Sequence, residues 1–278
     1  MLSARVMAGG LCLFTVGCIA APLDEGAELM GTEVHMATEA PIIVMNGDDP
    51  VFFWLPSTQQ ALRQLAQAPL EDATGEMAST PLLASVEGQR LLGYVARCTL
   101  PAGESLHSAA HGVSFQGGIG LAPQWAMAPL GGVAPQRWVT ACLLQTLNGL
   151  GMRVGIRVSG SHPALAGGPG EGAAGYTVPD TTMFGNVLRA GEPAAFACVD
   201  TAILDACGPT WSIHTLERLC GLSPTCGLTL LGHCALPCNP DAAGNATCTG
   251  PGGVVYPEAI SSSLKQTGFV ALYGDCDG

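Results

Sequence analysis

The sequence has 278 residues and is 48% hydrophobic but only 12% charged, with 38 glycines and a formal net charge of −12. Because charged residues usually make up about a quarter of a soluble protein, this composition favours an extracellular or periplasmic protein. Nucleic-acid binding requires clustered lysine and arginine. Lys265 is the single lysine and the arginines are scattered along the sequence, so nucleic acid is excluded as a partner.

Residues 1–17 are typical of an export signal. Arg5 precedes an apolar run from Val6 to Val16, which is too short to cross a bilayer of about 30 Å as a helix. Thr-Val-Gly before Cys18 resembles the lipobox of bacterial lipoproteins, although threonine stands where leucine is usual. We therefore expect lipidation of Cys18 and an anchor in the outer membrane or at the cell surface. The alternative is cleavage near Ala20 or Ala21, which gives a periplasmic or secreted protein.

Residues 18–41 lack periodicity and are interpreted as a flexible acidic tether. Between Cys18 and Asp49 the sequence has no lysine or arginine and seven acids: Asp24, Glu25, Glu28, Glu33, Glu39, Asp48 and Asp49. Residues 42–278 are expected to form a single globular domain.

The first part of this domain is predicted to contain short strands at 42–45 and 51–55, divided by a turn. Helices are predicted from Ser57 to Pro69 and from Thr80 to Cys98, on capping signals and apolar spacing. A hairpin is expected over 104–121. A helix over 136–147 and a strand over 152–158 are predicted to pack together at the centre of the core.

The second part shows weaker periodicity. Its predicted strands are 176–178, 194–200, 227–231, 254–256 and 269–273, with one helix over 212–220. The fold class is therefore predicted as α+β: a single disulfide-rich domain with helices packed on a mainly antiparallel sheet. The N-terminal half is expected to be more helical, and the C-terminal half to consist of short strands and loops.

Ten cysteines lie in the expected domain, residues 42–278: Cys98, Cys142, Cys198, Cys207, Cys220, Cys226, Cys234, Cys238, Cys248 and Cys276. No CxxC pair occurs among them, which disfavours a zinc ribbon, and exported cysteines usually oxidise. Five disulfides are predicted. Cys98 and Cys142 both face inward on predicted helices, so they are the preferred pair.

Candidate sites are few. Glu104, His107 and His111 have a spacing that would align them as metal ligands on a helix, but the expected hairpin would scatter them. Trp125 is interpreted either as a lid over the core or as an exposed stacking platform for a ligand. A nucleophilic Cys142 is an alternative to the disulfide. No catalytic residue, metal site or cofactor is assigned.

The stretch RWVTACLLQTLNGLGMRVGIRVSG (137–160), with GLAPQW (120–125) before it and FGN (184–186) after it, resembles a group of predicted cysteine-rich bacterial lipoproteins. The similarity runs from about Leu91 to Leu264. It implies export and one continuous domain, and implies no catalytic residue. The leading hypothesis is an exported lipoprotein with a structural or ligand-binding role in the cell envelope. The alternative is an exported hydrolase or metal-dependent enzyme.

Overall fold

The computed structural model describes residues 42–166, 174–189 and 193–277, without the side chains of Asp275 and Asp277. These residues belong to one compact unit. The predicted signal peptide, the proposed lipidation site Cys18 and the acidic tether lie outside the described residues. Within the described ranges, no helix combines the length and the apolar character required to span a membrane.

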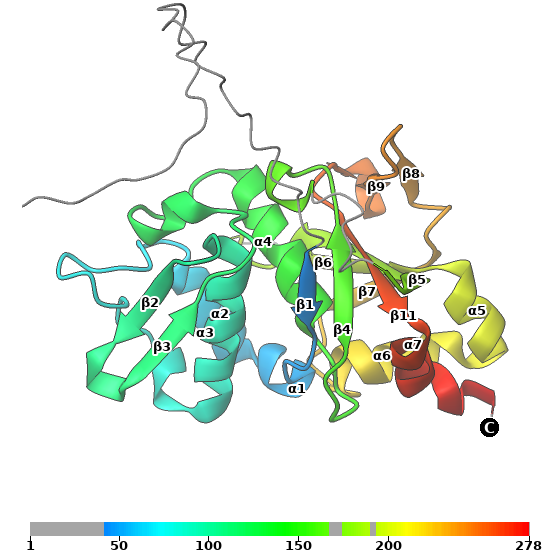
Figure 1. Cartoon of the computed structure of the whole chain (residues 1–278), viewed down its shortest axis with the longest axis horizontal. Helices are drawn as coiled ribbons and strands as arrows, with labels where there is room; N and C mark the ends of the chain where they lie inside the picture. Colours follow the sequence, from blue (N-terminus) through cyan, green and yellow to red (C-terminus); the bar gives the residue numbers. More distant parts are fainter. Residues whose placement is uncertain (1–41, 167–173, 190–192, 278) are drawn as a thin grey trace, which may run out of the picture. The chain divides into compact units, whose positions relative to one another are not determined.

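A six-stranded mixed sheet forms the centre of this unit (Figure 1). All neighbouring strands pair antiparallel except β6 and β7, which are parallel. The strand order is β1 (Ile43–Met45), β4 (Gly155–Ser159), β11 (Ile260–Lys265), β5 (Tyr176–Asn186), β6 (Ala194–Val199) and β7 (Leu228–His233). The prediction of an α+β fold with a mainly antiparallel sheet is confirmed.

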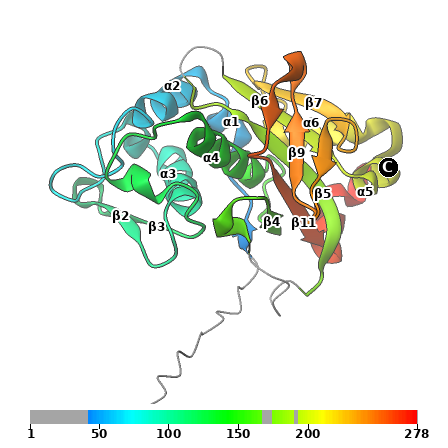
Figure 2. The same cartoon turned by 90° about the horizontal axis from the view of Figure 1, so that it is seen from above.

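Helices cover both faces of the sheet. Gln145 on α4 (Val133–Thr146) donates to the carbonyl oxygen of Thr181 at 3.2 Å. The neighbouring Asp180 contacts α6 (Trp211–Cys220) and α7 (Gln266–Tyr273) through its side chain. Helix α4 packs along β5, α7 contacts β5 and β11, and α6 contacts β7. Figure 2 shows α4 on the opposite side of the sheet from α5 (Thr201–Cys207).

The N-terminal part adds a layer outside α4. Helix α3 (Val86–Thr99) packs on α4, and the Cys98–Cys142 disulfide, the predicted pair, joins them with an S–S distance of 2.00 Å. The predicted hairpin is present as β2 (Ser105–Ser108) and β3 (Val113–Gln116). Strand β3 packs on α3 (Figure 1).

The C-terminal half contains the other four disulfides. They join Cys198 to Cys234, Cys207 to Cys276, Cys220 to Cys226 and Cys238 to Cys248. A small sheet of β8 (Cys238–Pro240), β9 (Ala246–Thr249) and β10 (Val255–Tyr256) contributes Tyr256 to a second core with Phe184 and Phe196. All ten cysteines within residues 42–278 are therefore paired, as predicted.

Two predicted strands are helices. Residues 51–55 fall in and after α1 (Pro50–Phe53), because Asp49 caps the amide of Val51 at 2.9 Å and Pro50 occupies the first helical position. Residues 269–273 belong to α7, where the backbone of Gly268 passes close to Val154. Short apolar runs do not by themselves distinguish a strand from a buried helix.

Other boundaries also differ from the predictions. Helix α2 spans Pro56–Leu65, and the predicted helix from Thr80 divides into a 3₁₀ turn, Pro81–Ala84, and α3, which Ser85 caps. Strand β5 is eleven residues long, whereas only its first three residues were predicted, so the C-terminal half is not made only of short strands. Strand β11 and helix α5 were not predicted.

Candidate functional site

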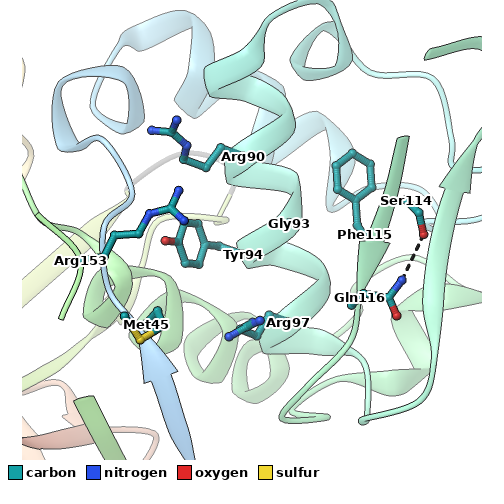
Figure 3. Close-up of a pocket in the computed structure, with 9 residues that line it drawn as sticks. All are labelled: Met45, Arg90, Gly93, Tyr94, Arg97, Ser114, Phe115, Gln116 and Arg153. Carbon is teal, nitrogen blue, oxygen red and sulfur yellow. Dashed lines mark hydrogen bonds between the residues drawn. The ribbon is translucent and has the colours of Figure 1, made fainter. Parts of the chain in front are cut away.

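A cavity with a volume of about 330 Å³ lies beside α3 (Figure 3). Arg90, Tyr94 and Arg97 recur on α3 at intervals of four and three residues, which places them on one side of the helix. Gly93 lies on α3 between these residues and β3, and a Cβ at this position would meet only the ring of Phe115, at 3.9 Å. A volume of this size falls at the lower end of the range for small-molecule sites.

The other walls come from distant parts of the sequence. Met45 at the end of β1 and Arg153 before β4 face α3 from one side (Figure 3). Ser114 and Gln116 on β3 lie on the other side, and the Gln116 amide donates to the Ser114 hydroxyl at 3.2 Å. Their hydroxyl and amide groups give this wall neutral hydrogen-bonding capacity.

Arg153 is held in place by the backbone beside it. Gly47 has a φ of +140°, and a Cβ at this position would lie 2.6 Å from Cγ of Arg153. Only glycine therefore permits the arginine stem to pack so closely against this turn. The turn itself is fixed by Asn46, whose Oδ1 accepts hydrogen bonds from the amide of Val154 and the side chain of Asn148.

Positive charge is concentrated at this cavity. The sequence has ten lysines and arginines in total, and Arg90, Arg97 and Arg153 all line the one site. None of the three forms a salt bridge with a carboxylate in the described part of the chain. Three neighbouring guanidinium groups repel one another, and an anion placed among them would relieve that repulsion.

Two buried titratable groups lie next to these arginines. Burial raises the pKa of Tyr94 and Asp48 raises it further, whereas the positive charges of Arg153, Arg90 and Arg97 lower it. Burial raises the pKa of the Asp48 carboxyl from 3.8 to about 7, with Asp49 adding to the rise and the Asp49 amide and Arg90 opposing it. Asp48 is 2% exposed, and its Oδ2 has no hydrogen-bond partner among the described residues.

A second polar cluster is closed to solvent. The Arg218 guanidinium forms a two-point ion pair with Asp180, at 2.6 and 2.9 Å, and both side chains have no exposed surface. The Tyr273 hydroxyl accepts from Arg218 and donates to Asp180, and the Ser262 hydroxyl also donates to Asp180. A ligand cannot reach this buried cluster. It joins β5, β11, α6 and α7 and so stabilises the fold.

The three candidate metal ligands, Glu104, His107 and His111, are spread along the hairpin and do not share one helix face. Glu104 precedes β2, His107 is on β2, and His111 is in the turn that follows. Each histidine contacts a serine hydroxyl, His107 that of Ser105 at 3.2 Å and His111 that of Ser108 at 3.0 Å. No group of three or more histidine, cysteine, aspartate or glutamate residues suited to a metal ion occurs in the ranges that the structure describes.

Two other candidate residues, Trp125 and Cys142, are buried in the core. Trp125 is fully buried and its indole N–H donates to the carbonyl oxygen of Ala68 at 3.0 Å. The interpretation of Trp125 as an exposed stacking platform is therefore corrected: it is part of the core. Cys142 is bonded to Cys98, which removes the thiol that a cysteine nucleophile requires.

No protein-family model matches this sequence, and neither the curated proteins nor the solved structures contain a match. The resemblance to cysteine-rich lipoproteins therefore stays a prediction.

Sequence reasoning missed the arginine cavity. A signal for part of it was present, because Arg90 and Arg97 are seven residues apart in a predicted helix and so share one side of it. Arg153 lies more than fifty residues further along the sequence, and only the fold brings it to α3 (Figure 3).

Proposed function

We propose that the protein is an exported lipoprotein, anchored through Cys18, whose disulfide-rich domain binds an anionic ligand in the cell envelope. The observation that supports binding is the gathering of Arg90, Arg97 and Arg153 around one cavity in a chain of net charge −12. Guanidinium groups bind carboxylates and phosphates through paired hydrogen bonds. Ser114 and Gln116 provide neutral partners for the rest of a small ligand.

Titration of the purified domain with citrate and with inorganic phosphate, followed by calorimetry at about pH 6, tests the site. At this pH the Asp48 carboxyl is largely protonated, since its pKa is about 7, and adds little competing negative charge. Arg97→Gln is expected to weaken binding about tenfold, and a triple change to glutamine at all three arginines to abolish it, because a charge-assisted hydrogen bond is worth about 1.5–3 kcal/mol.

Arg63→Gln is the matched control, because Arg63 lies on α2 and outside the cavity. It should leave the affinity unchanged. If no anion binds at about 10 mM, or if Arg63→Gln weakens binding as much as Arg97→Gln does, the proposed site is wrong.

Five disulfides favour an oxidising compartment outside the cytosol and so support the export part of the proposal. Mass spectrometry of the mature N-terminus in a bacterial expression host tests the anchor. We expect a diacylglyceryl-modified Cys18, and Cys18→Ser should abolish the modification. An unmodified N-terminus near Ala20 or Ala21 would identify ordinary signal cleavage and contradict the anchor.

A further inference from the structure

Among the described residues, strand β1 lies at an edge of the sheet and some of its backbone groups have no partner. The amide of Val158 donates to the carbonyl oxygen of Ile42, and the amide of Asn46 donates to that of Val154, both at 3.0 Å. In an antiparallel ladder the backbone groups of successive residues point to alternate sides. The N–H and C=O groups of Ile43 and Met45 therefore point away from β4, and outside the ladder they have no partner among the described residues.

The free edge of β1 faces the arginines. A cavity of about 320 Å³ separates Ile43 and Val44 from Arg97 and residues 117–119. This cavity shares Arg97 with the arginine cavity, where Met45 continues the same strand. A third cavity, of about 400 Å³, shares Arg90 and Arg153 and continues to the turn at Gly47. The three cavities are therefore adjacent along β1 and the loop that follows it, and together they are called the groove.

The side chains along this edge are also unusual for an unpartnered strand. Ile43 is 39% exposed and Met45 41% exposed, although natural edge strands usually carry charge or proline that prevents pairing. Exposed apolar side chains on a strand with free hydrogen-bonding groups are typical of a site for strand addition.

We propose that the groove accepts an extended peptide segment that pairs with the free edge of β1 and places its acidic side chains against Arg97, Arg90 and Arg153. This inference rests on the proposed anion site and specifies the class of its ligand. The pairing would satisfy the backbone groups of Ile43 and Met45. The charges are complementary, because the groove presents three guanidinium groups and one carboxylate, that of Asp49, which lines only the third cavity.

The spacing of the arginines fits such a ligand. Arg90 and Arg97 are seven residues apart, or about 10 Å along a helix that rises 1.5 Å per residue. Acidic residues at alternate positions of a strand lie on one face, about 6.6 Å apart, so three of them span about 13 Å. A peptide with alternating acidic and apolar residues can therefore contact the whole row of arginines, and its apolar residues would lie on its opposite face.

The first test compares ligands by calorimetry on the mature protein at about pH 6. The acetylated and amidated pentapeptide Glu-Val-Glu-Val-Glu should bind at least about tenfold more tightly than glutarate, which carries two carboxylates but no peptide backbone. Two N-methylated forms, one methylated on the glutamates and the other on the valines, block opposite edges of the peptide. One form should lose at least about tenfold in affinity, and the other should bind like the parent peptide.

The second test changes β1 alone. Ile43→Pro removes an N–H that points away from β4, a change that edge strands tolerate, and should weaken peptide binding at least about tenfold while glutarate binding stays unchanged. Ile43→Val, which keeps the N–H and an apolar β-branched side chain, is the control and should bind the peptide normally.

The possible failures can be told apart. If glutarate, phosphate and the peptide all fail to bind, the anion site itself is wrong. If glutarate binds but both N-methylated forms bind like the parent, or if Ile43→Pro binds the peptide normally, strand pairing is wrong. An oligogalacturonate of similar charge that binds as tightly as the peptide, with no effect of Ile43→Pro, would instead identify an acidic polysaccharide as the ligand and overturn the proposal.

Discussion

Asp180→Asn is expected to lower the free energy of unfolding by about 3–5 kcal/mol, because it leaves the Arg218 charge buried without a counterion. Both side chains are fully buried. Burial lowers the pKa of Arg218, but the charge of Asp180 and the hydrogen bonds to Asp180 and Tyr273 together raise it more, so the guanidinium stays charged. The substitution also weakens the acceptor for the hydroxyl groups of Ser262 and Tyr273. Urea unfolding with the disulfides intact measures the loss.

Two comparisons isolate the cause of this loss. The double variant Asp180→Asn, Arg218→Met removes both charges and should recover most of the stability, since apolar replacements of buried ion pairs are often neutral. Glu258→Gln breaks the Arg137–Glu258 pair, which has a single contact at 3.2 Å and some exposed surface, and should cost less. A double variant as unstable as Asp180→Asn alone would contradict the explanation.

Asp48→Asn should stabilise the protein at about pH 8 and have little effect at about pH 4. The folded Asp48 carboxyl has a pKa of about 7 against 3.8 in its ordinary state, so between these values the folded protein retains a proton that the unfolded chain releases. Stability that depends on Asp48 therefore falls as the pH rises from about 4 to about 7, and stays constant above. At about 1.4 kcal/mol per pKa unit, the full difference amounts to about 4 kcal/mol at most.

The measurement is the difference in unfolding free energy between Asp48→Asn and the parent protein, taken at several pH values in that window. Other titrating groups cancel in this difference. Asp49→Asn is the matched control, because it keeps an oxygen to cap Val51 and leaves Asp48 in place. The unfolding free energy of this variant should therefore change with pH almost as much as that of the parent protein. A difference for Asp48→Asn that does not change with pH would show that this carboxyl is not buried as described.

The sequence predicted best those parts of the fold that have regular apolar spacing or clear capping and turn residues. Helix α4 and strand β4 were expected from periodicity, and the Cys98–Cys142 bridge from two helices that present cysteine inward. Residues 51–55 and 269–273 were misassigned because a run of four or five apolar residues fits a strand and a buried helix equally well. Strand β11, with the sequence ISSSLK, has serines where a buried strand usually has β-branched residues.

The candidate site depended on tertiary structure. The sequence placed histidines and Trp125 among the candidates because their side chains carry binding chemistry, yet Trp125 is buried and the histidines lie on the hairpin. Arg153 and Asp48 acquire their roles from neighbours on α3 that are distant in sequence. Strand β1 was predicted, but only the sheet order shows that one of its edges has no neighbouring strand in the part of the chain that the structure describes, and that this edge faces the arginines.

Anomalous X-ray diffraction from a crystal soaked in sodium selenate would show directly whether an anion binds in the arginine cavity beside α3. Selenate carries two negative charges and four acceptor oxygens, and selenium locates it without ambiguity. We expect the strongest anomalous peak not due to sulfur to lie in the cavity among Arg90, Arg97 and Arg153. Selenate bound at other surfaces with this cavity empty would contradict an anion site beside α3.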